Sequence, residues 1–277
     1  TGKTNLIGVI VPKISTETAP RVVQGITEVL SENNYDVLIA NTNLSVEKEF
    51  EYLNIFKNNQ VDGVIFMGTK ITPRHKEIMN KLNVPIVVVA QYMDNYPCVY
   101  HDDFNAAKYM TEYLIGKGHK NIGFIGVYEE DRSVGLEREN GYIAALKEND
   151  LEVDMENLKL GDFSYESGYE LTKKLIKKKN IPTAIFAVTD NLAIATIDCL
   201  KDNGLNVPED VAVVSIGDTR ISQVVSPKLT TIHYHYKTSG RKSAEIMIEL
   251  LKNGIKTSKT IKKDIKLSYR LIERNSV

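Results

Sequence analysis

Short apolar runs alternate with amphipathic stretches along the whole chain, and this alternation constrains the fold more than any other feature. Runs such as Leu6–Val11 and Ile122–Val127 have the length and the β-branched content of buried strands. Stretches such as Asn105–Lys117 carry apolar side chains on one side at helical spacing. Strands that alternate with helices of about 10–15 residues are typical of βαβ units in a parallel sheet with helices on both faces.

The chain contains too many of these units for one sheet, so we predict two doubly wound α/β lobes. The predicted N-terminal lobe covers residues 1–115 and 236–263, and the predicted C-terminal lobe covers residues 116–235 and 264–277. No low-complexity linker separates the halves, which favours several short crossovers between them. Open α/β sheets bind ligands at the carboxyl ends of their strands, so we expect the functional residues in the loops there, facing a cleft between the lobes.

Charge and cysteine content exclude several classes of protein. The 35 Lys and Arg residues are balanced by 36 Asp and Glu residues, which gives a net charge of −1. A chain without basic excess is a poor candidate for binding a nucleic-acid backbone by itself. Its two cysteines, Cys98 and Cys199, form no CxxC motif, which excludes a disulfide scaffold and a cysteine-based zinc site.

The sequence shows neither a membrane span nor a signal peptide. Its longest apolar run, Pro85–Ala90, is far shorter than the roughly 20 residues that a span needs. The start, Thr1-Gly2-Lys3-Thr4, lacks the charged and apolar regions of a leader. It also lacks an initial Met, and we expect a cytoplasmic protein of which an upstream part is missing.

Enzyme motifs are absent or misplaced. No GxGxxG follows a strand and no GxSxG occurs, while Gly2-Lys3-Thr4 precedes a strand instead of following one as in a P-loop. His233 and His235 share one face of a strand, but no further metal ligands accompany them. We therefore predict no catalytic residues, no metal and no cofactor.

Polar loops after the strands are the candidate ligand contacts. The loop after the first strand offers a cation and hydroxyls just before a helix N-terminus, which suits an anionic or polyhydroxylated ligand, although an ordinary capping loop looks the same. Its candidate residues are Lys13, Ser15, Thr16 and Thr18. The carboxylates of Asp102-Asp103 and Thr189-Asp190 would either accept sugar hydroxyls or belong to the start of a helix.

Three further side chains have two interpretations each. Arg138 lies in the first turn of a helix, where a cation opposes the helix dipole, so it needs a ligand or a buried carboxylate as its partner. Phe163 and Tyr236 would either stack on a sugar ring or pack in the core.

Taken in order, the motifs of this chain resemble the effector-binding region of the lac/gal repressor family of bacterial transcription regulators. Each motif is weak alone, but together they cover nearly the whole chain in the family's order. They are Ile7-Gly8-Val9-Ile10-Val11-Pro12, Val61-Asp62-Gly63-Val64-Ile65, Asp102–Ala107, Gly118–Ile122, Arg138-x-x-Gly141-Tyr142, Thr189–Ala193, Gly204–Val211, Pro227–Ile232 and Leu271–Ser276.

The resemblance implies a periplasmic-binding-protein-like fold, a sugar or sugar-phosphate effector, and a homodimer that binds operator DNA through an upstream helix-turn-helix. It implies that the ligand shifts the protein between two lobe arrangements through its differential contacts with them. The implied effector contacts are the Lys13–Thr18 loop, Asp103, Arg138, Phe163, Asp190 and Tyr236.

The chain departs from the family pattern in two loops. The common Asn-Pro-Phe-Phe of the first loop is here Thr16-Glu17-Thr18-Ala19, and the strand-end Gly-Phe-Asp-Asp is here Ser215-Ile216-Gly217-Asp218. The usual hydroxyl-binding aspartate thus aligns with Gly217, so either Asp218 replaces it or the contact is lost.

These departures look most similar to the trehalose-repressor branch, whose effector is trehalose 6-phosphate. Lys13 and Arg138 would then hold the phosphate. Val134 stands where other members place a polar sugar contact.

Two alternatives remain open. One is a periplasmic sugar-binding protein for transport, which uses the same two-lobe fold and which an upstream signal peptide would favour. The other is a nucleotide- or sugar-processing enzyme, because fold does not fix function.

Overall fold

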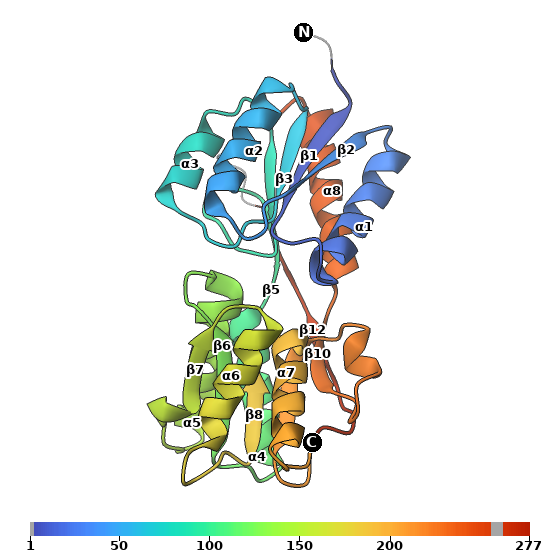
Figure 1. The fold of residues 1–277 in the computed structure, drawn as a ribbon. Coiled ribbons are helices and arrows are strands. Elements are labelled where there is room, and N and C mark those ends of the chain that lie inside the picture. Colours follow the sequence, from blue (N-terminus) through green and yellow to red (C-terminus); the bar gives the residue numbers. More distant parts are fainter. Residues whose placement is uncertain (1–2, 256–262) are drawn as a thin grey trace. The chain divides into compact units, whose positions relative to one another are not determined.

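A computed structural model describes residues 3–255 and 263–277, and the chain divides into two compact units. The first unit comprises Thr1–His101 and His235–Ser268, and the second comprises Asp102–Tyr234 and Tyr269–Val277. Each unit is built on its own six-stranded sheet (Figure 1). The predicted architecture of two α/β lobes is therefore confirmed.

The first unit has an all-parallel sheet in the order β11-β5-β4-β3-β1-β2. The apolar runs of its inner strands are almost entirely buried, as a sheet covered on both faces requires. Helices α1 and α8 lie side by side on one face of the sheet, and α2 and α3 lie on the other (Figure 1). The strands are β1 (Leu6–Val11), β2 (Asp36–Asn41), β3 (Gly63–Phe66), β4 (Ile86–Val89), β5 (Cys98–His101) and β11 (Asp264–Leu267), and the helices are α1 (Thr18–Glu32), α2 (Val46–Asn58), α3 (Pro73–Asn80) and α8 (Tyr236–Lys252).

The second unit repeats this plan in the order β12-β10-β9-β8-β6-β7, where β12 is antiparallel to β10 and the other pairs are parallel. Helix α4 packs on α5, and α6 packs on α7. Its elements are α4 (Asp103–Gly116), β6 (Ile122–Val127), the π-helix η1 (Arg132–Glu137), α5 (Arg138–Glu148), the 3-10 helix η2 (Met155–Asn157), β7 (Leu158–Gly161), α6 (Tyr165–Ile176), β8 (Ala184–Ala187), α7 (Asp190–Asp202), β9 (Ala212–Gly217), the 3-10 helix η3 (Ile221–Gln223), β10 (Thr230–Tyr234) and β12 (Tyr269–Ile272).

The division between the units differs from the predicted lobes at two places. Helix α4 belongs to the second unit, where it packs against α5, although the sequence had assigned it to the first. Strand β11 belongs to the first unit because it pairs with β5, although the sequence had assigned residues 264–277 to the second. Both differences arise from packing partners that are distant in sequence.

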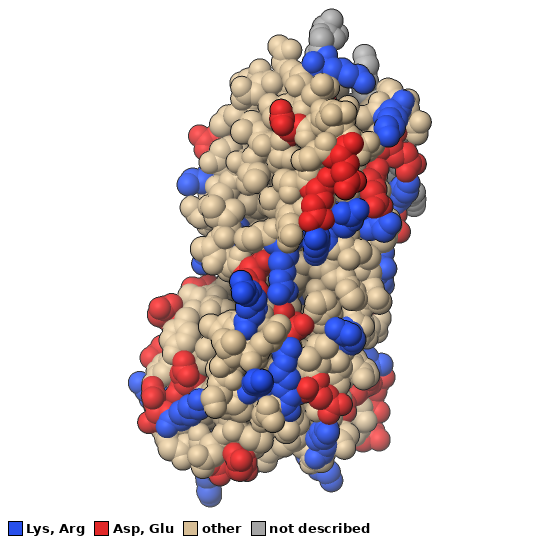
Figure 2. Space-filling view, turned by 90° about the vertical axis from the view of Figure 1, so that its right-hand side faces the viewer, with Lys and Arg blue, Asp and Glu red and all other residues tan. Residues whose placement is uncertain are grey.

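The surface carries mixed charge. On the face that Figure 2 shows, basic and acidic side chains are interspersed over both units. This mixture of charges agrees with the balanced composition, and that face has no broad basic patch of the kind that binds DNA. Among the described residues, no helix is long and apolar enough to cross a membrane.

Candidate functional site

A buried ion pair between α5 and α4 forms the centre of the candidate site in the second unit. Arg138 is 3% exposed and Asp103 is 6% exposed. The Nε and Nη2 atoms of Arg138 each lie 2.7 Å from Oδ1 of Asp103, and Nη1 donates to the carbonyl oxygen of Val188. The prediction that Arg138 needs a partner is confirmed, and a buried carboxylate supplies it.

Tyr234 closes this group from β10. Its hydroxyl donates to the same oxygen, Oδ1 of Asp103, at 3.0 Å, and its ring centroid lies 5.4 Å from the guanidinium carbon of Arg138. Burial raises the pKa of Asp103, although the charge and hydrogen bonds of Arg138 and the tyrosine oppose this effect. Oδ2 of Asp103 accepts no hydrogen bond from any residue that the structure describes, so this oxygen can accept one from a ligand.

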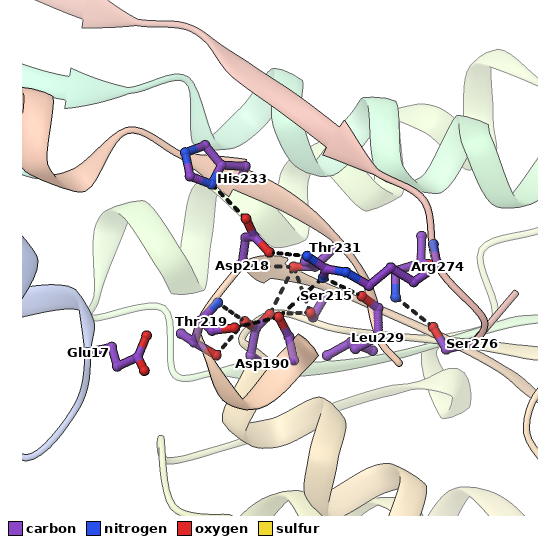
Figure 3. Close-up of polar contacts among 12 residues, drawn as sticks. Glu17, Asp190, Ser215, Asp218, Thr219, Leu229, Thr231, His233, Arg274 and Ser276 are labelled. Carbon is purple, nitrogen blue, oxygen red and sulfur yellow. Dashed lines mark hydrogen bonds and ion pairs between the residues drawn. The ribbon is translucent and has the colours of Figure 1, made fainter. Parts of the chain in front are cut away.

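A second polar cluster lies at the carboxyl end of β9, around Asp190 (Figure 3). Oδ1 of Asp190 accepts from the hydroxyls of Ser215 at 2.5 Å and Thr231 at 2.8 Å. Oδ2 accepts from both the backbone N–H and the hydroxyl of Thr219, each at 2.7 Å. Protein donors thus fill the four acceptor positions of a carboxylate. This arrangement favours a role for Asp190 in holding the loop after β9 over direct contact with a ligand.

Asp218 is also engaged by protein groups. Its Oδ1 lies 2.5 Å from Nη2 of Arg274, and its Oδ2 lies 2.8 Å from Nδ1 of His233 (Figure 3). Burial alone would raise the pKa of Asp218, but these two partners outweigh it and lower the pKa. The carboxylate therefore does not stand free in the place of the family's cleft aspartate.

Asp218 also accounts for the polar environment of His233, since the ring nitrogen faces this carboxylate. Among the described residues, no group of three or more His, Cys, Asp or Glu side chains could hold a metal ion.

The remaining predicted contacts belong to other elements of the two units. Phe163 follows β7 in the second unit, and its carbonyl oxygen accepts from Nδ2 of Asn191 at 2.8 Å, which ties that loop to α7. Tyr236 begins α8 in the first unit, where its ring meets His101 edge-on at 5.6 Å between centroids. The other predicted contacts of the first unit are loop or helix-start residues between β1 and the first turn of α1, namely Lys13, Ser15, Thr16 and Thr18.

In the second unit, the structure therefore forms two connected groups from the predicted residues. Asp103 and Arg138 form one group, and Asp190 and Asp218 belong to the other. They are joined through the chain itself, because the Val188 carbonyl that Arg138 binds lies two residues before Asp190.

Two acidic residues beside this site were not predicted. Asp131 caps η1, because its Oδ1 accepts from the N–H of Val134 at 2.9 Å. An aspartate just before a helix is a common N-cap, so the sequence offered a signal for this residue. Glu139 is buried in the first turn of α5, and burial raises its pKa. Its Oε2 has no hydrogen-bond partner among the described residues.

Comparison with known proteins identifies the class. Residues 111–277 match the periplasmic binding protein-like domain. The structure of the transcription regulator CcpA of Lactococcus lactis superposes with a TM-score of 0.90 over 99% of both chains, at 27% identity. The fold is thus that of periplasmic-binding-protein-like effector domains.

Curated relatives identify the family. Catabolite control protein A of Priestia megaterium is 36% identical over 83% of this chain and 70% of its own length. The regulator RegA of Clostridium saccharobutylicum is 31% identical over 100% of this chain and 82% of its own length. The chain belongs to the LacI family of transcriptional regulators, and these relatives are regulators rather than enzymes.

Proposed function

We propose that this chain is the effector-binding and dimerisation region of a cytoplasmic repressor of carbohydrate genes. Its effector is a sugar or a sugar phosphate, and trehalose 6-phosphate is the first compound to test. The observation that carries the proposal is the buried Arg138–Asp103 pair, which leaves one oxygen of Asp103 without a partner. Two relatives support the choice of ligand, because one is a sucrose operon repressor from Staphylococcus xylosus, 29% identical, and another was solved with bound ribose, 25% identical.

The chemistry of the pair favours hydroxyl groups at this point. A sugar hydroxyl both donates and accepts, so it can donate to Asp103 Oδ2 while accepting from the guanidinium edge of Arg138. The charge of Arg138 is already balanced by Asp103 at 2.7 Å, so a phosphate here would meet a neutral pair rather than a free cation. We therefore assign the unphosphorylated part of a phosphosugar, rather than its phosphate, to Arg138 and Asp103.

Titration calorimetry tests this assignment with trehalose, trehalose 6-phosphate, sucrose, glucose and ribose. We expect Asp103→Asn to weaken binding of the sugar that binds by at least about tenfold, because a hydrogen bond to a charged acceptor contributes about 1.5–3 kcal/mol. Arg138→Ala should weaken binding further.

Arg132→Ala is the matched control, because this arginine lies six residues before Arg138 and has an exposed ion pair with Glu137 at 3.3 Å. Thermal unfolding checks that each variant is folded. Unchanged affinity in folded Asp103→Asn would reject the role of the pair, and no binding by any of the five sugars would reject the proposed effector class.

The homodimer has candidate contacts in both units. In the second unit, Ile221 and Val224 are 49% and 78% exposed on and beside η3. In the first unit, Leu38 and Ile39 are exposed on β2, which is an edge strand of its sheet. Exposed apolar residues on an edge strand or a short surface helix mark association surfaces, and a two-fold dimer would pair each patch with its copy.

Sedimentation velocity tests the dimer. We expect wild-type protein to sediment as a dimer and Val224→Glu to shift it toward the monomer, because the dimer would bury an unpaired charge. Met155→Glu is the control, since Met155 is equally a surface residue at 62% exposure. A Val224→Glu protein that dimerises as tightly as wild type would remove this surface from the proposal.

A further inference from the structure

We propose that Asp131 is a further effector-binding residue whose carboxylate accepts a hydrogen bond from a sugar hydroxyl beside Arg138. This inference rests on the proposed sugar-binding function and adds a residue that selects for neutral hydroxyl groups over a phosphate at this end of the site.

The backbone around Asp131 holds its side chain in one place. Its N–H donates to the carbonyl of Tyr128 at 3.1 Å, and its own carbonyl accepts from Gly135 at 2.9 Å and Leu136 at 3.1 Å. Oδ1 accepts from the N–H of Val134 at 2.9 Å. A Cβ at Gly135 would lie 2.3 Å from the Tyr128 carbonyl oxygen, so this turn closes only with glycine there. The carboxylate is therefore preorganised, as a binding group should be.

The segment that Asp131 begins leads directly to Arg138. It is a π-helix, Arg132–Glu137, and it continues without a break into α5, whose first residue is Arg138. π-Helical turns are rare and occur often at functional sites, because the wider turn changes the direction of the side chains that follow. Here the turn packs against α4, α5 and β6, and α4 and α5 are the helices that carry the Asp103–Arg138 pair.

The charges around Asp131 leave it without a cation of its own. Asp103 on α4 and Arg138 on α5 lie near enough for their charges to act on it, but they are paired with each other at 2.7 Å. The other charged residues of its turn are Glu129, Glu130 and Arg132, and Arg132 pairs with Glu137 instead. No ion pair among the described residues includes Asp131.

Burial without a counter-cation raises the pKa of Asp131 to about 6, and the charge of Asp103 adds to this effect. The carboxylate is thus ionised at neutral pH at a free-energy cost that a hydroxyl donor would reduce. A phosphate placed here would in contrast meet the neutral Asp103–Arg138 pair and the uncompensated charge of Asp131, which repels it. Both carboxylates can accept hydrogen bonds from the hydroxyls of a sugar ring.

Asp131→Asn separates this role from capping, because Asn is as good an N-cap as Asp. The probes are the neutral sugars trehalose, sucrose, glucose and ribose, together with trehalose 6-phosphate, titrated by calorimetry at pH 7 and pH 5. If hydroxyl binding favours the ionised carboxylate, the sugar lowers the pKa of Asp131, so wild-type affinity is full above about pH 6 and lost below it. We expect about a tenfold weaker Kd at pH 5 than at pH 7.

In Asp131→Asn we expect about tenfold weaker binding at pH 7 and no such loss at pH 5, with unchanged thermal unfolding. Asp154→Asn is the matched control, because Asp154 caps η2 through the N–H of Glu156 in the same unit and should leave both affinities at the wild-type level. For trehalose 6-phosphate, whose phosphate also titrates, the difference between wild type and variant is the quantity compared.

Three results would overturn the inference. If a sugar binds but Asp131→Asn changes neither its affinity nor its pH dependence, Asp131 is only a helix cap and the proposed function still holds. If wild-type affinity for a neutral sugar rises as the pH falls, and Asp131→Asn removes that rise, the protonated form binds and the hydroxyl-acceptor role is wrong. If no probe binds wild-type protein, both this inference and the proposed effector class fail.

Discussion

Replacing Asp190 by Asn tests whether this residue holds the loop after β9 together. Asp190 is 2% exposed and accepts four hydrogen bonds, and Asn keeps its size but replaces one oxygen by an NH2 group. Hydroxyls can rotate to meet the new donor, but the N–H of Thr219, 2.7 Å from Oδ2, cannot. If the NH2 group takes the Oδ2 position, the Thr219 hydroxyl can accept from it, but the backbone N–H of Thr219 loses its hydrogen bond to a charged acceptor.

One hydrogen bond to a charged group contributes about 1.5–3 kcal/mol, so we expect a loss of that size, or roughly ten- to a hundredfold in the unfolding equilibrium. Urea unfolding followed by circular dichroism measures the free energy. Hydrogen exchange of the peptide that contains Thr219 reports the local effect, because its amide should exchange faster.

Asp198→Asn is the control on the same helix, since within residues 3–255 and 263–277 its carboxylate accepts only a surface hydrogen bond, from Tyr165 at 2.9 Å. We expect this control to change stability by less than about 0.5 kcal/mol. An Asp190→Asn protein as stable as the control, with unchanged exchange at Thr219, would refute the positioning role and restore Asp190 as a candidate ligand contact.

Three further variants test the fold and its pH dependence. Gly25→Ala should destabilise the first unit by about 1–3 kcal/mol in urea unfolding, because the new Cβ would lie 2.0 Å from a backbone carbonyl oxygen of α8, and this overlap outweighs the higher helix propensity of Ala. Glu49→Ala should cost about 1–3 kcal/mol, since it leaves its buried partner His75, 2.7 Å away, without its hydrogen-bond partner, whereas exposed Glu77→Ala should cost less than about 1 kcal/mol. Asp218 has a lowered pKa in the fold, so its stabilising contribution is present above its ordinary value of 3.8 and is lost as the pH falls below it; stability measured against pH should fall less steeply there in Asp218→Asn.

Local patterns in the sequence predicted the fold well. The spacing of apolar residues identified most strands and helices. Ser45, a residue type that favours the N-cap, caps α2 and accepts from the N–H of Lys48 at 3.3 Å. The edge strand β7 was not predicted, because its residues are only partly buried and form no apolar run. The lobe boundaries differed for a related reason, since α4 and β11 are assigned by partners far along the chain.

The candidate site was predicted in part. The electrostatic misplacement of Arg138 in a first turn correctly indicated a special partner, and Asp103 was named as a candidate on separate grounds. The hydroxyls around Asp190 could not be found in this way. Ser215 and Thr231 meet because β9 and β10 are neighbours in the register that pairs these two residues, and a sequence alone does not give strand order.

The glycine that replaces the family's cleft aspartate has a physical reason in this chain. A Cβ on Gly217 would lie 3.0 Å from Oδ2 of Asp190, so a side chain at position 217 would crowd the carboxylate that holds the loop. Asp218 follows Gly217 in the same loop, but each of its two oxygens already interacts with a protein group, Arg274 or His233. If this loop makes no carboxylate contact with the effector, hydroxyl recognition in the second unit falls to other acceptors. Asp131 lies near Arg138, is held by a rigid turn and has no cation of its own. We therefore expect substitution of Asp131 to change effector affinity and substitution of Asp218 to leave it unchanged.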